Sequence, residues 1–300
     1  MKRRVVDIHP HIISTDTQAY PRDPLWGRQS SWSQERPAST EQLLRAMDEA
    51  GVARAAIVQA STCYGYDNSY VADAVAAHPD RFTGVFSVDM LAADAPARIR
   101  HWAGSGLTGL RLFTAGSTVE GQMPGLDDPR SFPAWDCAAD LGLPVCVQMR
   151  IAGVPQLRVL LARYPRVPIV LDHFFALPLD EGPPYASAQE LFRLAAHPNV
   201  YLKLTPVILG KARLGQASPQ SFFSRALAEF GASRIAWGSN FPATAGSLKT
   251  LLEEAQQALA WAGGDDLAWI FHRTAERLYP ALRADAGPAT THDDRNKESA

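Results

Sequence analysis

The stretch Val5-Val6-Asp7-Ile8-His9-Pro10-His11 places two histidines at the end of a short apolar run near the N-terminus. Its β-branched residues predict a buried strand, and Pro10 ends the pairing because it has no N–H to donate. In an extended chain, His9 and His11 point to the same face. The spacing leaves two interpretations open, a divalent metal site or two ordinary loop histidines, because buried imidazoles need polar partners.

The composition is that of a globular protein with a large core, since 46% of the 300 residues are hydrophobic and 20% are charged. The net charge of −2 gives no reason to expect nucleic acid or a membrane surface as a partner. No apolar run is long enough to cross a membrane. Three scattered cysteines form no C-x-x-C pair, which is typical of a reducing compartment. We therefore expect a cytoplasmic monomer or homo-oligomer.

Seven further apolar runs follow the first, and a helical segment separates each run from the next. The expected strands are residues 55–59, 82–88, 106–113, 144–149, 167–172, 200–204 and 234–237. Buried parallel strands are continuous apolar runs of this kind, so the alternation predicts an α/β fold, a (β/α)8 TIM barrel. A doubly wound open sheet is the alternative. However, the one G-x-G-x-x-G pattern, residues 104–109, precedes a strand, whereas a dinucleotide-binding loop follows one.

The expected barrel is distorted by long connections after its strands. Residues 12–38, residues 114–130 and a proline-rich segment after His173 are too long for passive connections, which indicates functional loops over the site. An extra helix follows the last strand. We expect one barrel domain over residues 1–283 and a disordered tail over residues 284–300, which are small, polar and charged.

The first helix after the long N-terminal loop has clear boundary signals. Ser39 is a suitable N-cap, and Gln42 stands three residues later, as in a capping box. Gly51 is suited to the left-handed position that ends many helices. The sequence therefore predicts a helix between Ser39 and Gly51.

Chemistry in such a barrel occurs at the C-terminal ends of the strands, so the polar residues there are candidates for the site. In chain order they are His9, His11, Gln59, Asp89, Arg111, Gln148, Arg150, Asp172, His173, Lys203, Ser239 and Asn240. Three histidines, two arginines and a lysine at one mouth indicate an active site. Because side chains alternate along a strand, Asp172 is expected to point away from His173 and to be structural.

Three of these motifs together resemble the amidohydrolase superfamily, and its amidohydrolase-related branch in particular. They are His9-x-His11 on the first strand, His173 on the sixth, and Trp237-Gly238-Ser239-Asn240-Phe241-Pro242 on the eighth. The branch contains 2-pyrone-4,6-dicarboxylate lactonases, sugar-acid lactonases, sulfomuconolactone hydrolases and, more distantly, non-oxidative decarboxylases. The resemblance extends from residue 5 to about residue 280.

One position differs from the superfamily pattern. The pattern usually has an aspartate on the eighth strand, where it binds metal or acts as a general base, and this chain has Asn240. An amide cannot accept a proton at neutral pH. The fifth strand has no histidine and the fourth has no obvious bridging lysine, so the resemblance implies at most one metal ion.

The resemblance implies that His9, His11 and His173 bind one zinc or manganese ion. A three-histidine site with an open position lowers the pKa of bound water towards ~7, and Asn240 would then only position this water. The alternative is metal-independent operation, in which the histidines bind substrate directly, as the pyrone-dicarboxylate lactonases show. His173, Asn240 and Arg111 are the expected catalytic residues.

A small anionic substrate is expected, because an arginine fork matches a carboxylate. Arg111 and Arg150 are the candidate clamps, with a surface salt bridge as the alternative for each. Gln148 contacts substrate or packs in the core, and Lys203 binds the substrate anion or pairs with Asp172. The expected loop residues that close over substrate are Tyr64, Trp26 and Arg130.

These features favour a hydrolase that opens a lactone of an acidic small molecule through water activated by a single metal. Such a reaction belongs to the catabolism of an aromatic or sugar-acid compound. Two other interpretations stay open. One is a metal-dependent, non-oxidative decarboxylase of an aromatic or unsaturated carboxylic acid, and the other is a catalytically degenerate binding barrel.

Overall fold

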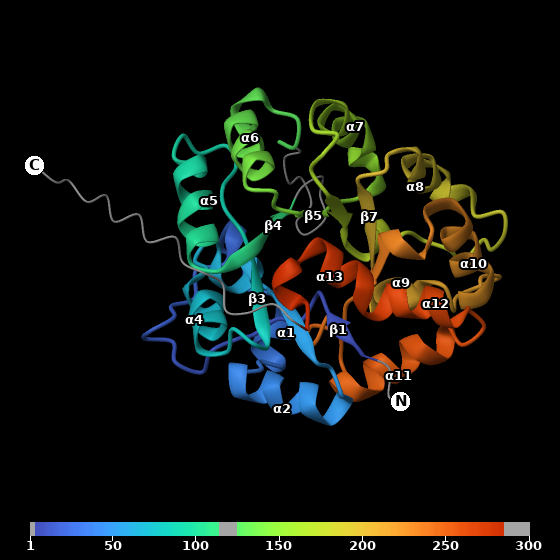
Figure 1. Cartoon of the computed structure of the whole chain (residues 1–300), viewed down its shortest axis with the longest axis horizontal. Coiled ribbons are helices and arrows are strands. Elements are labelled where there is room, and N and C mark those ends of the chain that lie inside the picture. Colours follow the sequence, from blue (N-terminus) through green and yellow to red (C-terminus); the bar gives the residue numbers. More distant parts are fainter. Residues whose placement is uncertain (1–3, 114–124, 285–300) are drawn as a thin grey trace, which may run out of the picture.

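The structure is a computed structural model that describes residues 4–113 and 125–284. Eight parallel strands form one sheet in chain order, and each strand pairs with the next (Figure 1). They are β1 (Val6–Asp7), β2 (Arg54–Val58), β3 (Phe82–Phe86), β4 (Leu107–Phe113), β5 (Val145–Gln148), β6 (Ile169–Leu171), β7 (Val200–Leu204) and β8 (Ile235–Trp237). A hydrogen bond of 3.3 Å from the N–H of Ile8 to the carbonyl of Trp237 links the two ends of the sheet. The predicted TIM barrel is confirmed.

Helices surround the sheet in the order that the alternation predicted (Figure 1). They are α1 (Ser31–Glu35), α2 (Thr40–Ala50), α3 (Ser61–Tyr64), α4 (Ser69–Ala77), α5 (Ala95–Gly104), α6 (Phe132–Asp140), α7 (Val154–Arg163), α8 (Gln189–Arg193), α9 (Pro206–Lys211), α10 (Pro219–Phe230), α11 (Leu248–Ala258), α12 (Gly264–Ala268) and α13 (Thr274–Leu278). A π-helical turn, Trp269–Arg273, joins the last two. No helix in the described ranges is long and apolar enough to span a membrane.

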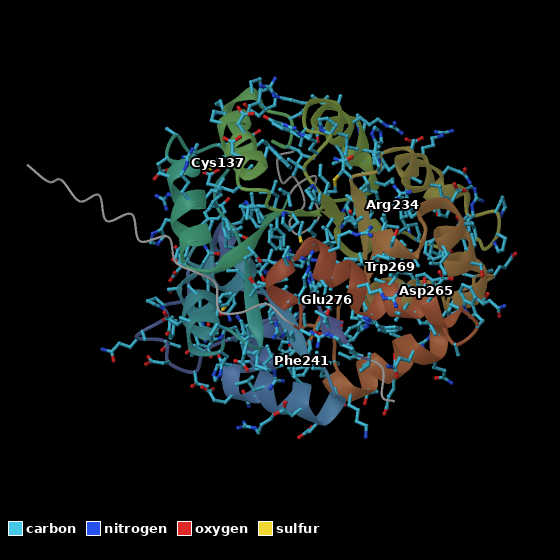
Figure 2. The ribbon with its side chains drawn as sticks, in the orientation of Figure 1. Cys137, Arg234, Phe241, Asp265, Trp269 and Glu276 are labelled. Atoms are coloured by element: carbon cyan, nitrogen blue, oxygen red, sulfur yellow. The ribbon has the colours of Figure 1, made fainter. Side chains whose placement is uncertain are left out.

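The extra C-terminal helix closes the end of the barrel opposite the site. In Figure 1, α13 crosses the centre of the ring. Tyr279 packs with inward-facing strand residues such as Val85 and Cys146, and a Cβ atom added to Gly109 would lie 2.8 Å from its ring. Glu276, labelled in Figure 2, pairs with Arg4 at 2.7 Å. The strands therefore enclose a packed interior that leaves their other ends for the site.

The helix after the long N-terminal loop has the predicted boundaries. The side chain of Ser39 accepts a hydrogen bond from the N–H of Gln42, and the Gln42 side chain accepts one from the N–H of Ser39. Gly51 ends the helix with φ 74°. The capping box and the glycine thus fix α2 locally, as the sequence predicts.

The sixth strand is shorter than predicted. It ends at Leu171, and the four residues from His173 to Ala176 have φ of 54°, 52°, 60° and 49°, in the left-handed region. The short helices α3 and α9 were not predicted, because each contains fewer than two turns and has no amphipathic repeat. The tail from residue 285 and residues 114–124 lie outside the described part of the chain.

Candidate active site

Three histidines meet at the C-terminal ends of the strands, as predicted. His9 and His11 follow β1, His173 follows β6, and all three are buried. The ring centroid of His9 lies 4.9 Å from that of His11 and 4.9 Å from that of His173. A Cβ atom on Gly238 would lie 2.6 Å from Cβ of His9, so the glycine after β8 is required for this approach.

A buried carboxylate lies among two basic side chains beside these rings. Oδ2 of Asp172 accepts a hydrogen bond of 2.9 Å from Nε of Arg111. Oδ1 of Asp172 forms an ion pair of 2.8 Å with Nζ of Lys203. The prediction that Asp172 points away from His173 was wrong. It assumed an extended backbone, and the left-handed conformation of His173 brings both side chains to the same side.

Lys203 is fully buried beneath the histidines. Its Nζ lies 2.8 Å from Nδ1 of His9 and 3.3 Å from Sγ of Cys146, in addition to Asp172. Of the two predicted roles, the structure contains the pairing with Asp172. The side chain of Lys203 is fully buried, and a role of Lys203 in substrate binding stays a prediction.

Burial and neighbouring charge determine the protonation of the site. Burial, together with Arg111, lowers the pKa of His11 to about 3. Burial lowers the pKa of His173 to about 4, and burial with Lys203 holds that of His9 well below its usual range. Burial alone would raise the pKa of Asp172, but the adjacent Lys203 and Arg111 outweigh it and hold the pKa below the ordinary value. At neutral pH the site therefore contains neutral imidazoles and an ionised carboxylate.

The donor set fits a divalent metal ion. One ligand atom each from His9, Asp172 and His173 lies within 4.8 Å of the others. Nε2 of His9 is buried and has no hydrogen-bond partner among the described residues. A neutral imidazole nitrogen and a carboxylate oxygen are ligands of zinc and manganese. This group contains Asp172 in the place where the sequence predicted His11.

His11 lies next to this group with a defined tautomer. Its Nδ1 lies 2.7 Å from the carbonyl of Val58, which only accepts, so Nδ1 carries the proton and Nε2 keeps its lone pair. Trp32 of the long loop stacks on its ring, with the centroids 5.1 Å apart. The geometry thus directs a basic nitrogen of His11 away from β2.

Asn240 follows β8 with φ 53°, and its Nδ2 donates a hydrogen bond of 2.9 Å to Oγ1 of Thr244.

Asp7, which was not among the predicted site residues, supports the ends of β1 and β8. One of its oxygens accepts hydrogen bonds of 2.9 Å from the N–H groups of His9 and Ser239. An ionisable residue within an apolar strand was the available signal.

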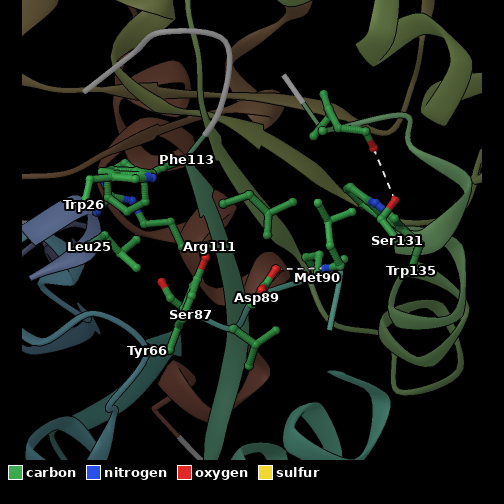
Figure 3. Close-up of a pocket in the computed structure, with 15 residues that line it drawn as sticks. Leu25, Trp26, Tyr66, Ser87, Asp89, Met90, Arg111, Phe113, Ser131 and Trp135 are labelled. Carbon is green, nitrogen blue, oxygen red and sulfur yellow. Dashed lines mark hydrogen bonds between the residues drawn. The ribbon is translucent and has the colours of Figure 1, made fainter. Parts of the chain in front are cut away.

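A cavity of about 200 Å³ opens beside the histidine cluster. Figure 3 shows Trp26, Phe113 and Arg111 on one side of it and Ser131 and Trp135 on the other. The guanidinium carbon of Arg111 lies 4.2 Å from the ring centroid of Phe113. None of the three histidines is among the described lining residues. Arg111 connects the cavity to them, because its Nε holds Asp172.

The predicted substrate-binding residues divide into two groups. Gln148 accepts a hydrogen bond from Nη2 of Arg111, and Trp26 lines the cavity. Tyr64 is buried, and its hydroxyl accepts a hydrogen bond of 2.8 Å from the N–H of Ser14. Arg130 is exposed and pairs with Asp128 at 2.7 Å. The structure therefore brings Gln148 and Trp26 to the site and places Tyr64 and Arg130 elsewhere.

Two further residues line the cavity, and the sequence did not predict the first of them. Tyr66 lines it in place of Tyr64, because the helical turn α3 directs Tyr64 inward. Asp89, a candidate from the end of the third strand, also lines the cavity, where its Oδ1 accepts a hydrogen bond of 3.0 Å from the N–H of Leu91. Arg150 is exposed and is not among the described lining residues.

Comparisons with known proteins agree with this fold. Residues 6–281 match a family model described as Amidohydrolase. The L-fucono-1,5-lactonase of Burkholderia ambifaria is 31% identical over 242 residues, which are 79% of this chain and 80% of that protein. The structure of a candidate 2-pyrone-4,6-dicarboxylic acid hydrolase from Pseudomonas putida is 22% identical, with a TM-score of 0.75 over 94% of this chain and 99% of that one. An amidohydrolase from Burkholderia multivorans with bound zinc is 20% identical, with a TM-score of 0.72 over 92% and 99% of the two chains.

Proposed function

The chain belongs to the amidohydrolase family, and we propose that it is a hydrolase that opens the ring of a lactone carrying an acidic group. The observation that carries this proposal is the position of Arg111. Its guanidinium lies at the wall of the cavity and also holds Asp172 beside the neutral histidines. A cation between a small-molecule cavity and a cluster of imidazoles is suited to an acyl compound with a carboxylate.

The described part of the chain leaves donors of Arg111 for this substrate. Its Nε is used by Asp172 and its Nη2 by Gln148, and Nη1 forms no hydrogen bond to a described residue. These two contacts hold the guanidinium plane in place, so that it loses little freedom when it binds a carboxylate or a carbonyl oxygen. Arg111 is thus both the expected anion clamp and a stabiliser of charge on the carbonyl oxygen.

In the proposed reaction, water adds to the lactone carbonyl carbon and the ring C–O bond breaks. The leaving alkoxide takes a proton, and the products are a hydroxycarboxylate and one released proton. The neutral His11 has a nitrogen lone pair, on Nε2, to receive the water proton and to return it to the alkoxide. Asn240 cannot act as the base and is assigned to orienting the water.

His9, Asp172 and His173 are the residues that would hold a metal, one zinc or manganese ion. Such an ion would act as a Lewis acid and lower the pKa of bound water towards ~7. The zinc in the Burkholderia multivorans amidohydrolase supports this proposal. Metal-independent operation by the imidazoles is the alternative.

The similarity to an L-fucono-1,5-lactonase supports a lactone as the substrate class. Aromatic or sugar-acid catabolism is the metabolic setting that we propose. A panel of carboxylated lactones, pyrones and sugar lactones, followed with a pH indicator, tests the reaction because each opening releases one proton. We expect proton release with at least one lactone, its loss in His173→Ala, and its retention in His101→Ala, an exposed histidine on α5.

Proton release and carbon dioxide release, measured together, separate the other interpretations. Carbon dioxide release from dihydroxybenzoates or unsaturated acids, without proton release from any lactone, would show a decarboxylase instead. Binding of these compounds with no product from either assay would show a degenerate barrel. Either result would contradict the proposed lactonase.

A further inference from the structure

We propose that the cavity beside Arg111 binds an aromatic or unsaturated arm of the lactone, so that aryl lactones with a carboxylate are better substrates than polyhydroxylated sugar lactones. This inference rests on the proposed function and names its substrate class.

The described wall of the cavity is mostly apolar. Of its 15 described residues, ten have apolar or aromatic side chains, and the polar ones other than Arg111 are Ser87, Asp89 and Ser131. Each of these three makes a hydrogen bond within the protein, whereas the indole N–H of Trp135, also in the wall, is buried without a partner among the described residues. Ser87 accepts from Ser61 at 2.9 Å, Asp89 accepts from the N–H of Leu91, and Ser131 donates to the carbonyl of Asp128 at 2.7 Å. A sugar ring would bury its hydroxyl groups with few partners, which is unfavourable.

The mouth of the cavity exposes two aromatic side chains. Trp26 is 45% exposed and Tyr66 39%, and they are two of the five large hydrophobic side chains that are exposed in the described chain. Trp26 meets Phe113 edge to face, with the centroids 6.2 Å apart, and has a left-handed φ of 61°. Exposed aromatics and strained backbone both concentrate at binding sites.

The inner end of the cavity has a positive charge over an aromatic ring. The guanidinium of Arg111 lies over Phe113 and is held by Asp172 and Gln148. A carboxylate bound there would leave the rest of the molecule against Phe113 and Trp26. The volume is suitable, since the cavity of about 200 Å³ exceeds the ~150 Å³ in which an apolar protein cavity binds benzene.

A binding experiment tests the cavity without catalysis. Phenylacetate and gluconate carry one carboxylate each and differ in the apolar or polyol arm, and titration calorimetry measures their Kd. We expect phenylacetate to bind about tenfold more tightly than gluconate, from the apolar area that its ring buries. Trp26→Ala should weaken phenylacetate about fivefold and gluconate less than twofold. Leu214→Ala, which removes a 51% exposed apolar side chain outside the cavity, should change neither.

A turnover experiment then separates the two proposals. Phthalide-3-carboxylate and D-glucaro-1,4-lactone are both five-membered lactones with a free carboxylate, and proton release gives kcat/KM for each. We expect at least a tenfold preference for the phthalide, reduced by Trp26→Ala. Preferred hydrolysis of the sugar lactone, unaffected by Trp26→Ala, would overturn the inference and leave the lactonase function standing. Selective binding of phenylacetate with no hydrolysis of any lactone would overturn the proposed function and leave the cavity assignment standing.

Discussion

The Asn240 amide cannot accept a proton, so other groups must act as the general base of the proposed reaction. In Asn240→Asp, the new carboxylate would keep a hydrogen bond with Thr244, now as acceptor, and would also accept a proton from water. We expect lactone hydrolysis to be retained or to rise by up to ~100-fold, the contribution of a positioned general base. Steady-state proton release measures it, with Asn240→Ala as the control that loses the amide. An Asp variant that is folded but as inactive as the wild type would favour the degenerate barrel.

The raised pKa of the buried Asp7 predicts that the free energy of unfolding depends on pH. Burial raises its pKa from the ordinary 3.8 to about 6, so the folded state binds a proton that the unfolded chain releases. The contribution of the protonated Asp7 to the free energy of unfolding is fully present below pH 3.8 and is lost as the pH rises to about 6 and above. Asp7→Asn keeps an oxygen for the N–H groups of His9 and Ser239 and cannot ionise.

The difference in unfolding free energy between Asp7→Asn and wild type should therefore increase by up to about 3 kcal/mol between pH 4 and pH 7. Urea denaturation at several pH values measures it. The exposed Asp140→Asn, at the end of α6, is the matched control for the removal of one carboxyl outside the site. A flat difference for Asp7→Asn would show that its carboxyl is not perturbed.

The sequence predicts single residues well where they follow regular strands. His9, His11, Arg111 and Gln148 come to the site because each lies at or near the C-terminal end of a strand of the barrel. Asp172 was misplaced, because one residue of left-handed backbone reverses the direction that alternation predicts. Residues 173–176 contain neither glycine nor asparagine, the residue types that most often signal this conformation.

At the scale of elements, the left-handed turn from His173 to Ala176 is the least expected feature. Left-handed backbone costs an L-residue roughly 1–2 kcal/mol, and a glycine avoids this cost. Ala176 has φ 49°, and its side chain is exposed, so Ala176→Gly removes no packing. We expect this variant to be more stable by about 1 kcal/mol, after allowance for the greater freedom of glycine in the unfolded chain.

Thermal and urea denaturation measure this gain. Ala76→Gly in α4 is the matched control, because this alanine is also exposed but lies within an ordinary helix. It should lose about 1 kcal/mol. Equal losses in both variants would mean that residue 176 does not have a left-handed conformation in solution.

The elements were predictable in proportion to their length and periodicity. β7 (Val200–Leu204) has the predicted bounds, and α2 (Thr40–Ala50) begins and ends where its cap residues predicted, because each combines an apolar pattern with clear boundary residues. The helical turn α3 was predicted as a loop. This error moved the expected aromatic contact from Tyr66 to Tyr64, since one helical turn decides which tyrosine reaches the cavity.

At the scale of the whole molecule, the barrel was predictable because its signal repeats along the chain. Eight apolar runs with helices between them have few other solutions, and the order of the strands follows from the right-handed connections. The cavity was not predictable. It is formed by segments far apart in the sequence, from Trp26 to Trp135, whose relative positions depend on loop conformation.

The proposed metal site exists only in the assembled molecule, because His9 follows β1 whereas Asp172 and His173 follow β6. The unfolded chain cannot bring them together, so metal binding should stabilise the fold. We expect about one zinc or manganese ion per purified chain, and a Tm that falls on chelation and recovers when metal is added. At a free metal concentration ~100 times the Kd, the free energy of unfolding rises by about 2.7 kcal/mol.

His9→Ala should lose both the ion and the shift in Tm, whereas His101→Ala should keep both. Fewer than ~0.2 ions per chain in a protein that still opens lactones would contradict the metal site and would assign the reaction to the imidazoles alone.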